Sequence, residues 1–224
     1  GVVGPSPYSA ILQIDRSTIS DNFASECPAA VFYNGNNGLV RDSTISNNTC
    51  VGHPEWGSFL FERQLSVVSS TLTGNSDPTI KLYDGGSVAT LERSIIHGQC
   101  ALGWDGGSII TAYANLESPG DTCFLDADGD LRNVASPVLY PLGYYGGPTE
   151  THRPAAGSMA VDHVFGVTVP NCPRPDQRGI PRPQNGTGGI GTPCDIGAVE
   201  LVLDEIFIDG FDYGFIGPWS ANVW

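Results

Sequence analysis

Positive charge is scarce in this sequence. Ten Lys and Arg residues stand against 24 Asp and Glu residues, which gives a formal net charge of −14, and Lys81 is the single lysine. Such a chain is repelled by phosphate backbones and by anionic membrane surfaces, so we expect no nucleic-acid partner. No apolar run approaches the roughly 20 residues that a membrane-spanning helix needs. We therefore also expect no membrane span.

The usual motifs of metal and catalytic sites are missing too. The six cysteines include no C-x-x-C pair that would indicate zinc, and the four histidines show no spacing such as H-x-x-x-H. Ser158 lacks the second glycine of a nucleophile elbow. The glycine-rich stretch 186–191 carries no lysine and follows no expected strand, unlike a phosphate-binding loop.

The composition is that of a folded, turn-rich protein. Hydrophobic residues make up 40% and charged residues 15%, while Gly (29) and Pro (17) are too frequent for a helical bundle and too aperiodic for collagen. The first residue is Gly, so we expect that a signal peptide or a longer N-terminal part has been removed or left out.

A short phrase recurs through the first half of the chain. Its four copies start 26, 27 and 24 residues apart, and a period in this range is typical of a solenoid. They are Ser17-Thr18-Ile19-Ser20-Asp21-Asn22, Ser43-Thr44-Ile45-Ser46-Asn47-Asn48, Ser70-Thr71-Leu72-Thr73-Gly74-Asn75 and Ser94-Ile95-Ile96-His97-Gly98-Gln99.

The phrase predicts a β-strand because β-branched residues alternate with small polar ones, and Asn or Gly then ends the strand. Two to three short strands per repeat, with no helix between them, predict an all-β fold, a right-handed parallel β-helix with an irregular Gly/Pro-rich C-terminal cap region. An antiparallel sandwich is the alternative. In the β-helix, Ile19, Ile45, Leu72 and Ile96 form one inward ladder, and Asn22, Asn48 and Asn75 stack at a corner.

The cysteines form three sequential pairs, 23, 23 and 22 residues apart. Six cysteines allow 15 connectivities, but a coil that returns every 22 to 27 residues favours neighbours in sequence. We predict the disulfides Cys27–Cys50, Cys100–Cys123 and Cys172–Cys194, each worth about 3 kcal/mol in the chain-entropy model. Free buried thiols are the alternative.

Beyond about Gly103 the repeat fades and a series of other motifs follows. They are Gly146-Gly147-Pro148-Thr149-Glu150-Thr151-His152, Ala156-Gly157-Ser158-Met159-Ala160-Val161-Asp162, Asp176-Gln177-Arg178-Gly179-Ile180-Pro181-Arg182-Pro183 and Cys194-Asp195-Ile196-Gly197-Ala198-Val199-Glu200. This order resembles the C-terminal region of the bacterial secreted and cell-surface β-helix proteins called choice-of-anchor-Q proteins. They are similar in turn to polymorphic outer-membrane-protein repeats.

The last stretch also resembles a known element. Residues 206–220 are similar to a tail of exported gammaproteobacterial proteins with a DGFE-S-G run before Trp-Ser, although Asp212 and Tyr213 replace the usual Glu and Ser. Together the resemblances imply an exported bacterial protein, secreted or at the cell surface, and no established catalytic residue. We expect β-helix coils in 1–135, a loop and cap region packed on the same solenoid in 136–203, and a tail in 204–224.

Two acidic groupings are candidate sites. Asp126, Asp128 and Asp130 lie on one short loop and can hold a calcium ion through oxygen ligands, while a solvated acidic turn is the alternative. The second grouping is a structural motif in the C-terminal region, in which an arginine pairs with a carboxylate and fixes a loop. Its members are Asp176, Arg178, Asp195 and Glu200.

We therefore expect a structural, adhesive or self-assembling role outside the cell. The partners would be extracellular glycans or a second copy, stacked head-to-tail into filaments through the open coil end and the apolar strands near 201–208. The alternative is a carbohydrate-active β-helix enzyme, a polysaccharide lyase or hydrolase, whose site needs paired carboxylates or calcium with a base. Trp56 and Trp104 are candidates to stack on sugar rings.

Overall fold

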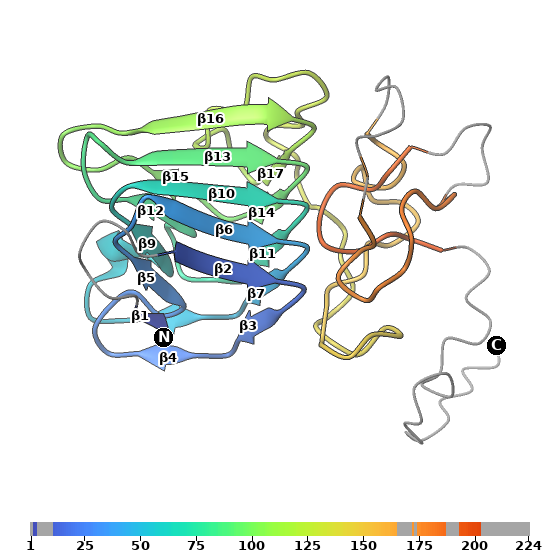
Figure 1. The fold of residues 1–224 in the computed structure, drawn as a ribbon, viewed down its shortest axis with the longest axis horizontal. Helices are drawn as coiled ribbons and strands as arrows, with labels where there is room; N and C mark the ends of the chain where they lie inside the picture. Colours follow the sequence, from blue (N-terminus) through green and yellow to red (C-terminus); the bar gives the residue numbers. More distant parts are fainter. Residues whose placement is uncertain (1, 4–10, 165–171, 173, 187–192, 203–224) are drawn as a thin grey trace.

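A computed structural model describes residues 2–3, 11–164, 172, 174–186 and 193–202 of the 224-residue chain. The expected tail in 204–224 lies outside these residues. The described part contains no α-helix and one 3-10 helix, η1 (Pro54–Trp56). Its strands wind through three five-stranded sheets and one two-stranded sheet, and every paired strand is parallel to its neighbour. The chain is thus a parallel β-helix, as the repeat predicts (Figure 1).

Each five-stranded sheet takes one strand from each coil. Sheet A contains β1 (Val2–Val3), β5 (Val31–Tyr33), β9 (Phe59–Phe61), β12 (Ile80–Leu82) and β15 (Cys100–Ala101). Sheet B contains β2 (Ile11–Asp15), β6 (Asn37–Arg41), β10 (Gln64–Val68), β13 (Val88–Glu92) and β16 (Ser108–Tyr113). Sheet C contains β3 (Thr18–Ser20), β7 (Thr44–Ser46), β11 (Thr71–Thr73), β14 (Ile95–His97) and β17 (Leu116–Ser118). The short fourth sheet pairs β4 (Phe23–Ala24) with β8 (Thr49–Cys50).

The predicted inward ladder is confirmed. Ile19 pairs with Ile45, Ile45 with Leu72, and Leu72 with Ile96, and all four belong to one hydrophobic core. The column ends at Glu117, the partner of Ile96. This buried carboxylate accepts hydrogen bonds from the backbone of residues 122 and 123, so it fixes the turn that follows.

The predicted asparagine stack is confirmed at the corner that follows sheet C. The Asn22 side-chain amide donates to Asn48 Oδ1 at 2.8 Å, and the Asn48 amide donates to Asn75 Oδ1 at 2.9 Å. The same amides of Asn48 and Asn75 also donate to the carbonyls of Ile19 and Ile45. Each asparagine therefore ties its own coil to its neighbour.

A second polar column, which the sequence analysis did not predict, lies at the corner between sheets B and C. The side-chain oxygen of one coil accepts a hydrogen bond from the backbone N–H of the coil before it, through Ser43, Ser70, Ser94, Asn115 and Asp130. The residue before Ser17, the first donor, and before each acceptor up to Asn115 has a positive φ, between 44° and 47°; these residues are Arg16, Asp42, Ser69, Arg93 and Ala114. Non-glycine residues seldom adopt this conformation, and the ladder offsets its cost.

The six cysteines pair as the spacing predicts: Cys27–Cys50, Cys100–Cys123 and Cys172–Cys194. The second of these bonds helps to close the last coil, where Cys123 and Leu125 are fully buried in the core. The backbone of residues 128–134 hydrogen-bonds to the region of β17. One end of sheet C therefore has a covered edge.

The Gly/Pro-rich region lies along a flank of the solenoid. We call the described residues from 136 to 202 the lateral segment; Figure 1 shows them in gold to orange beside the stacked strands. Their contacts reach the outward side chains of sheet C at Thr18, Thr44, Ser46 and Thr71. Because sheet C is buried on both faces, β7 and β11 are fully buried strands.

Candidate functional site

The outward face of sheet B carries a groove of about 540 Å³. It runs over β2, β6, β10 and β13, so it follows the axis of the coil rather than the direction of the strands. Strand parity explains its lining, because alternate residues of each strand point outward. The outward residues include Gln13, Asn37, Gln64, Ser66 and Thr90.

The chemistry of this groove is neutral. Its lining combines side-chain amides, hydroxyls and aliphatic groups, and none of the described residues that line it is charged; they are Ile11, Leu12, Gln13, Asn36, Asn37, Gly38, Leu39, Gln64, Leu65, Ser66, Val88 and Thr90. The sequence analysis missed these residues. Their outward register could have been read from the alternation in each strand, but not which sheet stays uncovered.

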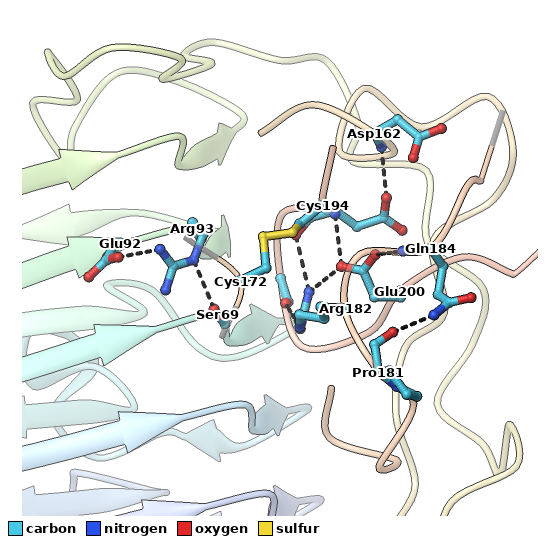
Figure 2. Close-up of a disulfide and its surroundings, with 12 residues drawn as sticks. Ser69, Glu92, Arg93, Asp162, Cys172, Pro181, Arg182, Gln184, Cys194 and Glu200 are labelled. Atoms are coloured by element: carbon cyan, nitrogen blue, oxygen red, sulfur yellow. Dashed lines mark hydrogen bonds and ion pairs between the residues drawn. A yellow bond between two sulfur atoms is a disulfide. The ribbon is translucent and has the colours of Figure 1, made fainter. Parts of the chain in front are cut away.

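Leu39 also lines a second cleft, of about 210 Å³, between the corner that follows sheet B and the lateral segment. Four of the ten basic residues of the chain line this cleft: Arg41, Arg93, Arg174 and Arg182. Figure 2 shows Arg93 on the coil side, held by Ser69 and Glu92, and Arg182 on the side of the lateral segment, with the Cys172–Cys194 disulfide between them.

Asp42 lies among these guanidinium groups. Its carboxylate is within 3.9 Å of Arg41 and Arg182 and 3.6 Å from Arg174. Burial raises the pKa of Asp42, while the arginines oppose that shift. The four arginines are themselves paired with carboxylates, Arg41 with Asp15, for example, at 2.6 Å. The cleft is therefore a balanced ion cluster that joins the coil to the lateral segment, not a free cationic site.

The structural motif predicted at Asp176, Arg178, Asp195 and Glu200 lies in the interior of the lateral segment. The side chains of Arg178 and Asp176 are fully buried, and Arg178 Nε and Nη2 both donate to Asp176 Oδ2, at 3.0 and 2.9 Å. Arg178 also donates to the carbonyls of Tyr145 and Glu200. The arginine thus links three stretches of irregular chain.

Asp195 and Glu200 lie beside a second arginine, Arg182. Arg182 Nη1 donates to Glu200 Oε1 at 2.6 Å (Figure 2). Asp195 accepts from the backbone N–H groups of Asp162 and Leu201. Burial, with Glu200 nearby, raises the pKa of Asp195 to about 8. The structure therefore brings all four motif residues into one buried network, in which they have structural contacts.

The acidic loop at residues 126–130 takes part in the polar column at the corner between sheets B and C. Asp130 accepts from the backbone and side chain of Asn115 and from Ala127, and Asp126 accepts from Thr111. In the described part of the chain, no group of three His, Cys, Asp or Glu side chains is arranged to hold a metal ion. Calcium binding at Asp126, Asp128 and Asp130 stays a prediction, which a chelator-dependent melting temperature would reveal.

Two histidines lie where sheet C meets the lateral segment. His152 Nδ1 is 2.8 Å from the Tyr140 carbonyl, which can only accept, so Nδ1 carries the proton. In the neutral ring, Nε2 then accepts from Ser46 Oγ at 2.7 Å. His97 Nδ1 lies 2.9 Å from Thr73 Oγ1. Burial lowers the pKa of both rings.

We expect His152 and His97 to contribute stability that is lost in mild acid. Because the folded state favours neutral imidazole, the stabilisation is present above the ordinary pKa of about 6.5 and is lost as the pH falls below it. Between about pH 7.5 and pH 5 the melting temperature of the wild type should therefore fall relative to that of His152→Gln, in which the buried carboxyl groups are unchanged. A variant that follows the wild-type curve would show that His152 does not contribute to this response.

A comparison of the sequence with protein families supports the coiled architecture. The family model described as the right handed beta helix region matches residues 7–117, just under half of the chain. The fold is thus a right-handed parallel β-helix. No curated protein and no solved structure matches the sequence.

Proposed function

We propose that this right-handed β-helix is part of an exported bacterial surface protein, and that it adheres to extracellular glycans through the groove of sheet B. The observation that carries the proposal is the neutral lining of a long groove on an otherwise strongly acidic chain. Amide and hydroxyl side chains both donate and accept hydrogen bonds, which suits a hydroxyl-rich ligand.

The fold and the disulfides are compatible with an extracellular location. Three disulfides and a β-helix fold are compatible with an extracellular protein, since disulfides persist in oxidising compartments. The motifs shared with exported bacterial β-helix proteins favour the same location. Among the described residues, no helix has the length and apolar character to cross a membrane.

Adhesion is favoured over catalysis by the residues in the groove. Cleavage of a glycosidic bond needs an acid and a second carboxylate on either side of the scissile bond. The described residues that line the groove supply no carboxylate, histidine or lysine for acid or base chemistry. The carbohydrate-active enzyme therefore stays the second candidate, and turnover that a single Asp or Glu substitution abolishes would establish it.

Head-to-tail assembly is a less favoured form of the same surface role. Residues 128–134 already hydrogen-bond along β17, so that strand offers no free edge to a second copy. The apolar stretch 203–208, which the filament hypothesis needs, lies outside the described residues. Light scattering of the purified protein across a concentration series tests self-assembly directly.

The adhesion proposal is tested by a single charge in the middle of the groove. Ser66→Arg should reduce retention on the neutral polysaccharide that the wild type binds by at least tenfold, because a long cationic side chain fills the groove. Thr49→Arg is the matched control, since Thr49 is exposed on β8, outside sheet B. A wild type that binds none of a panel of neutral polysaccharides, or equal losses in both variants, would contradict the proposal.

A further inference from the structure

Trp104 is exposed to an unusual degree. The residue is 85% exposed to solvent, whereas Trp56 packs against the Cys27–Cys50 cluster and stacks on His53 at 4.9 Å between ring centroids. Leaving an indole in water forgoes the stabilisation that its burial would give. A ligand that covers the ring would recover it.

The backbone that carries Trp104 is held in place. Gly103 N donates to Gly106 O at 2.8 Å and Gly106 N returns a bond to Gly103 O at 3.2 Å, which closes a tight turn. The turn sits directly on the coil below, because a Cβ on Gly103 would lie 2.3 Å from the Tyr83 carbonyl oxygen. An aromatic side chain on a fixed turn loses little entropy when it binds.

The turn stands at the edge of sheet B. It leads directly into β16, whose first residue, Ser108, pairs with Val88 of the groove lining. Asn36 lines the groove from the corresponding corner, between sheets A and B, of an earlier coil, whereas Trp104 lies outside the lining, on the coil next to β13. Tyr83, on the coil below the turn, is also 43% exposed.

The shape of the groove and the net charge of the chain define the kind of ligand that can bind. An extended peptide cannot add to the face of sheet B, because β6, β10 and β13 already pair with a strand on each side. A net charge of −14 disfavours an anionic polymer, and the uncharged lining offers a cation no partner. A neutral polysaccharide that lies along the coil axis meets both conditions.

We propose that Trp104 is the stacking platform of this groove and selects uncharged glycans whose sugar rings expose an apolar face. This inference rests on the proposed glycan adhesion and names the residue that sets its affinity and ligand class. The amides of the groove bind hydroxyl groups, and the indole covers the C–H face of a ring that extends past the end of the groove, from β13 toward β16.

The test compares three variants by titration calorimetry with cellohexaose, xylohexaose and mannohexaose, and with hexagalacturonate as the acidic probe. For the neutral probe that the wild type binds most tightly, we expect Trp104→Ala to weaken binding at least tenfold, as truncation of an aromatic anchor does, and Trp104→Phe to keep most of the affinity. Tyr144→Ala is the matched control, because Tyr144 is 71% exposed on the lateral segment. Hexagalacturonate should not bind.

The outcomes separate the two proposals. If Trp104→Ala binds like the wild type while Ser66→Arg does not bind, glycan adhesion stands and the role of Trp104 is wrong. Preferential binding of hexagalacturonate would likewise overturn the selection of uncharged glycans. If the wild type binds no probe in the calorimeter and no neutral polysaccharide in the retention assay, the proposed adhesion fails and this inference fails with it.

Discussion

Replacement of Arg178 by methionine is expected to lower the free energy of unfolding by about 3–5 kcal/mol, the usual cost of removing one partner from a buried ion pair. The side chains of Arg178 and Asp176 are both inaccessible to solvent. Methionine has a similar length but no donors, so it leaves the Asp176 carboxylate buried without its counter-charge. The carbonyls of Tyr145 and Glu200 lose their donors as well.

The loss should be measured by urea unfolding at neutral pH, with Arg132→Met as the control. Arg132 is also near a carboxylate, Asp121 at 3.8 Å, but its side chain is 55% exposed. An exposed pair of this kind contributes about 0–1 kcal/mol. Equal effects of the two substitutions would show that the pair of Arg178 and Asp176 does not hold the lateral segment together.

Leu72→Ala should destabilise the solenoid by about 2–5 kcal/mol, because it removes a fully buried side chain from the middle of the inward ladder. The coils above and below are hydrogen-bonded to this one, so they cannot collapse fully into the space. The cavity therefore persists between Ile45 and Ile96, which flank Leu72 in the column.

Ile110→Ala is the appropriate comparison for this ladder prediction. Ile110 lies on β16 of the same solenoid, but 51% of its side chain is in solvent, so its truncation should change stability by roughly 0.5 kcal/mol or less. Thermal and urea unfolding of both variants measure the difference. A Leu72→Ala protein as stable as Ile110→Ala would mean that the ladder does not support the fold.

The candidate site was predictable only in part. Trp104 and glycan partners could be named from composition, whereas the groove could not, because Gln13, Asn37, Gln64 and Ser66 look like ordinary outward strand residues. The sequence analysis missed the polar column at the corner between sheets B and C for a related reason. Ser43, Ser70 and Ser94 open their repeats, yet nothing local shows that their hydroxyls accept the backbone N–H of another coil.

The roles of the C-terminal motifs also depended on the tertiary structure. Gly147 must be glycine because a Cβ there would lie 2.8 Å from the Arg178 side chain. Gln177 bridges Thr18 and Thr44, more than 130 residues away in the chain, and His152 meets Ser46. Each of these contacts joins two segments whose separation in sequence has no period to reveal it.

The sequence alone determined the coil, the Ile and Asn columns and the cysteine pairing. These features repeat at the interval of one turn, and a parallel β-helix places residues one turn apart directly above one another. Only the tertiary structure decided which flank is covered and which stays open. The lateral segment has no repeat, so its position follows from buried polar contacts with sheet C that no local sequence pattern reveals. Its coverage of sheet C leaves the groove of sheet B in solvent, and this is the face to which we propose that glycans bind.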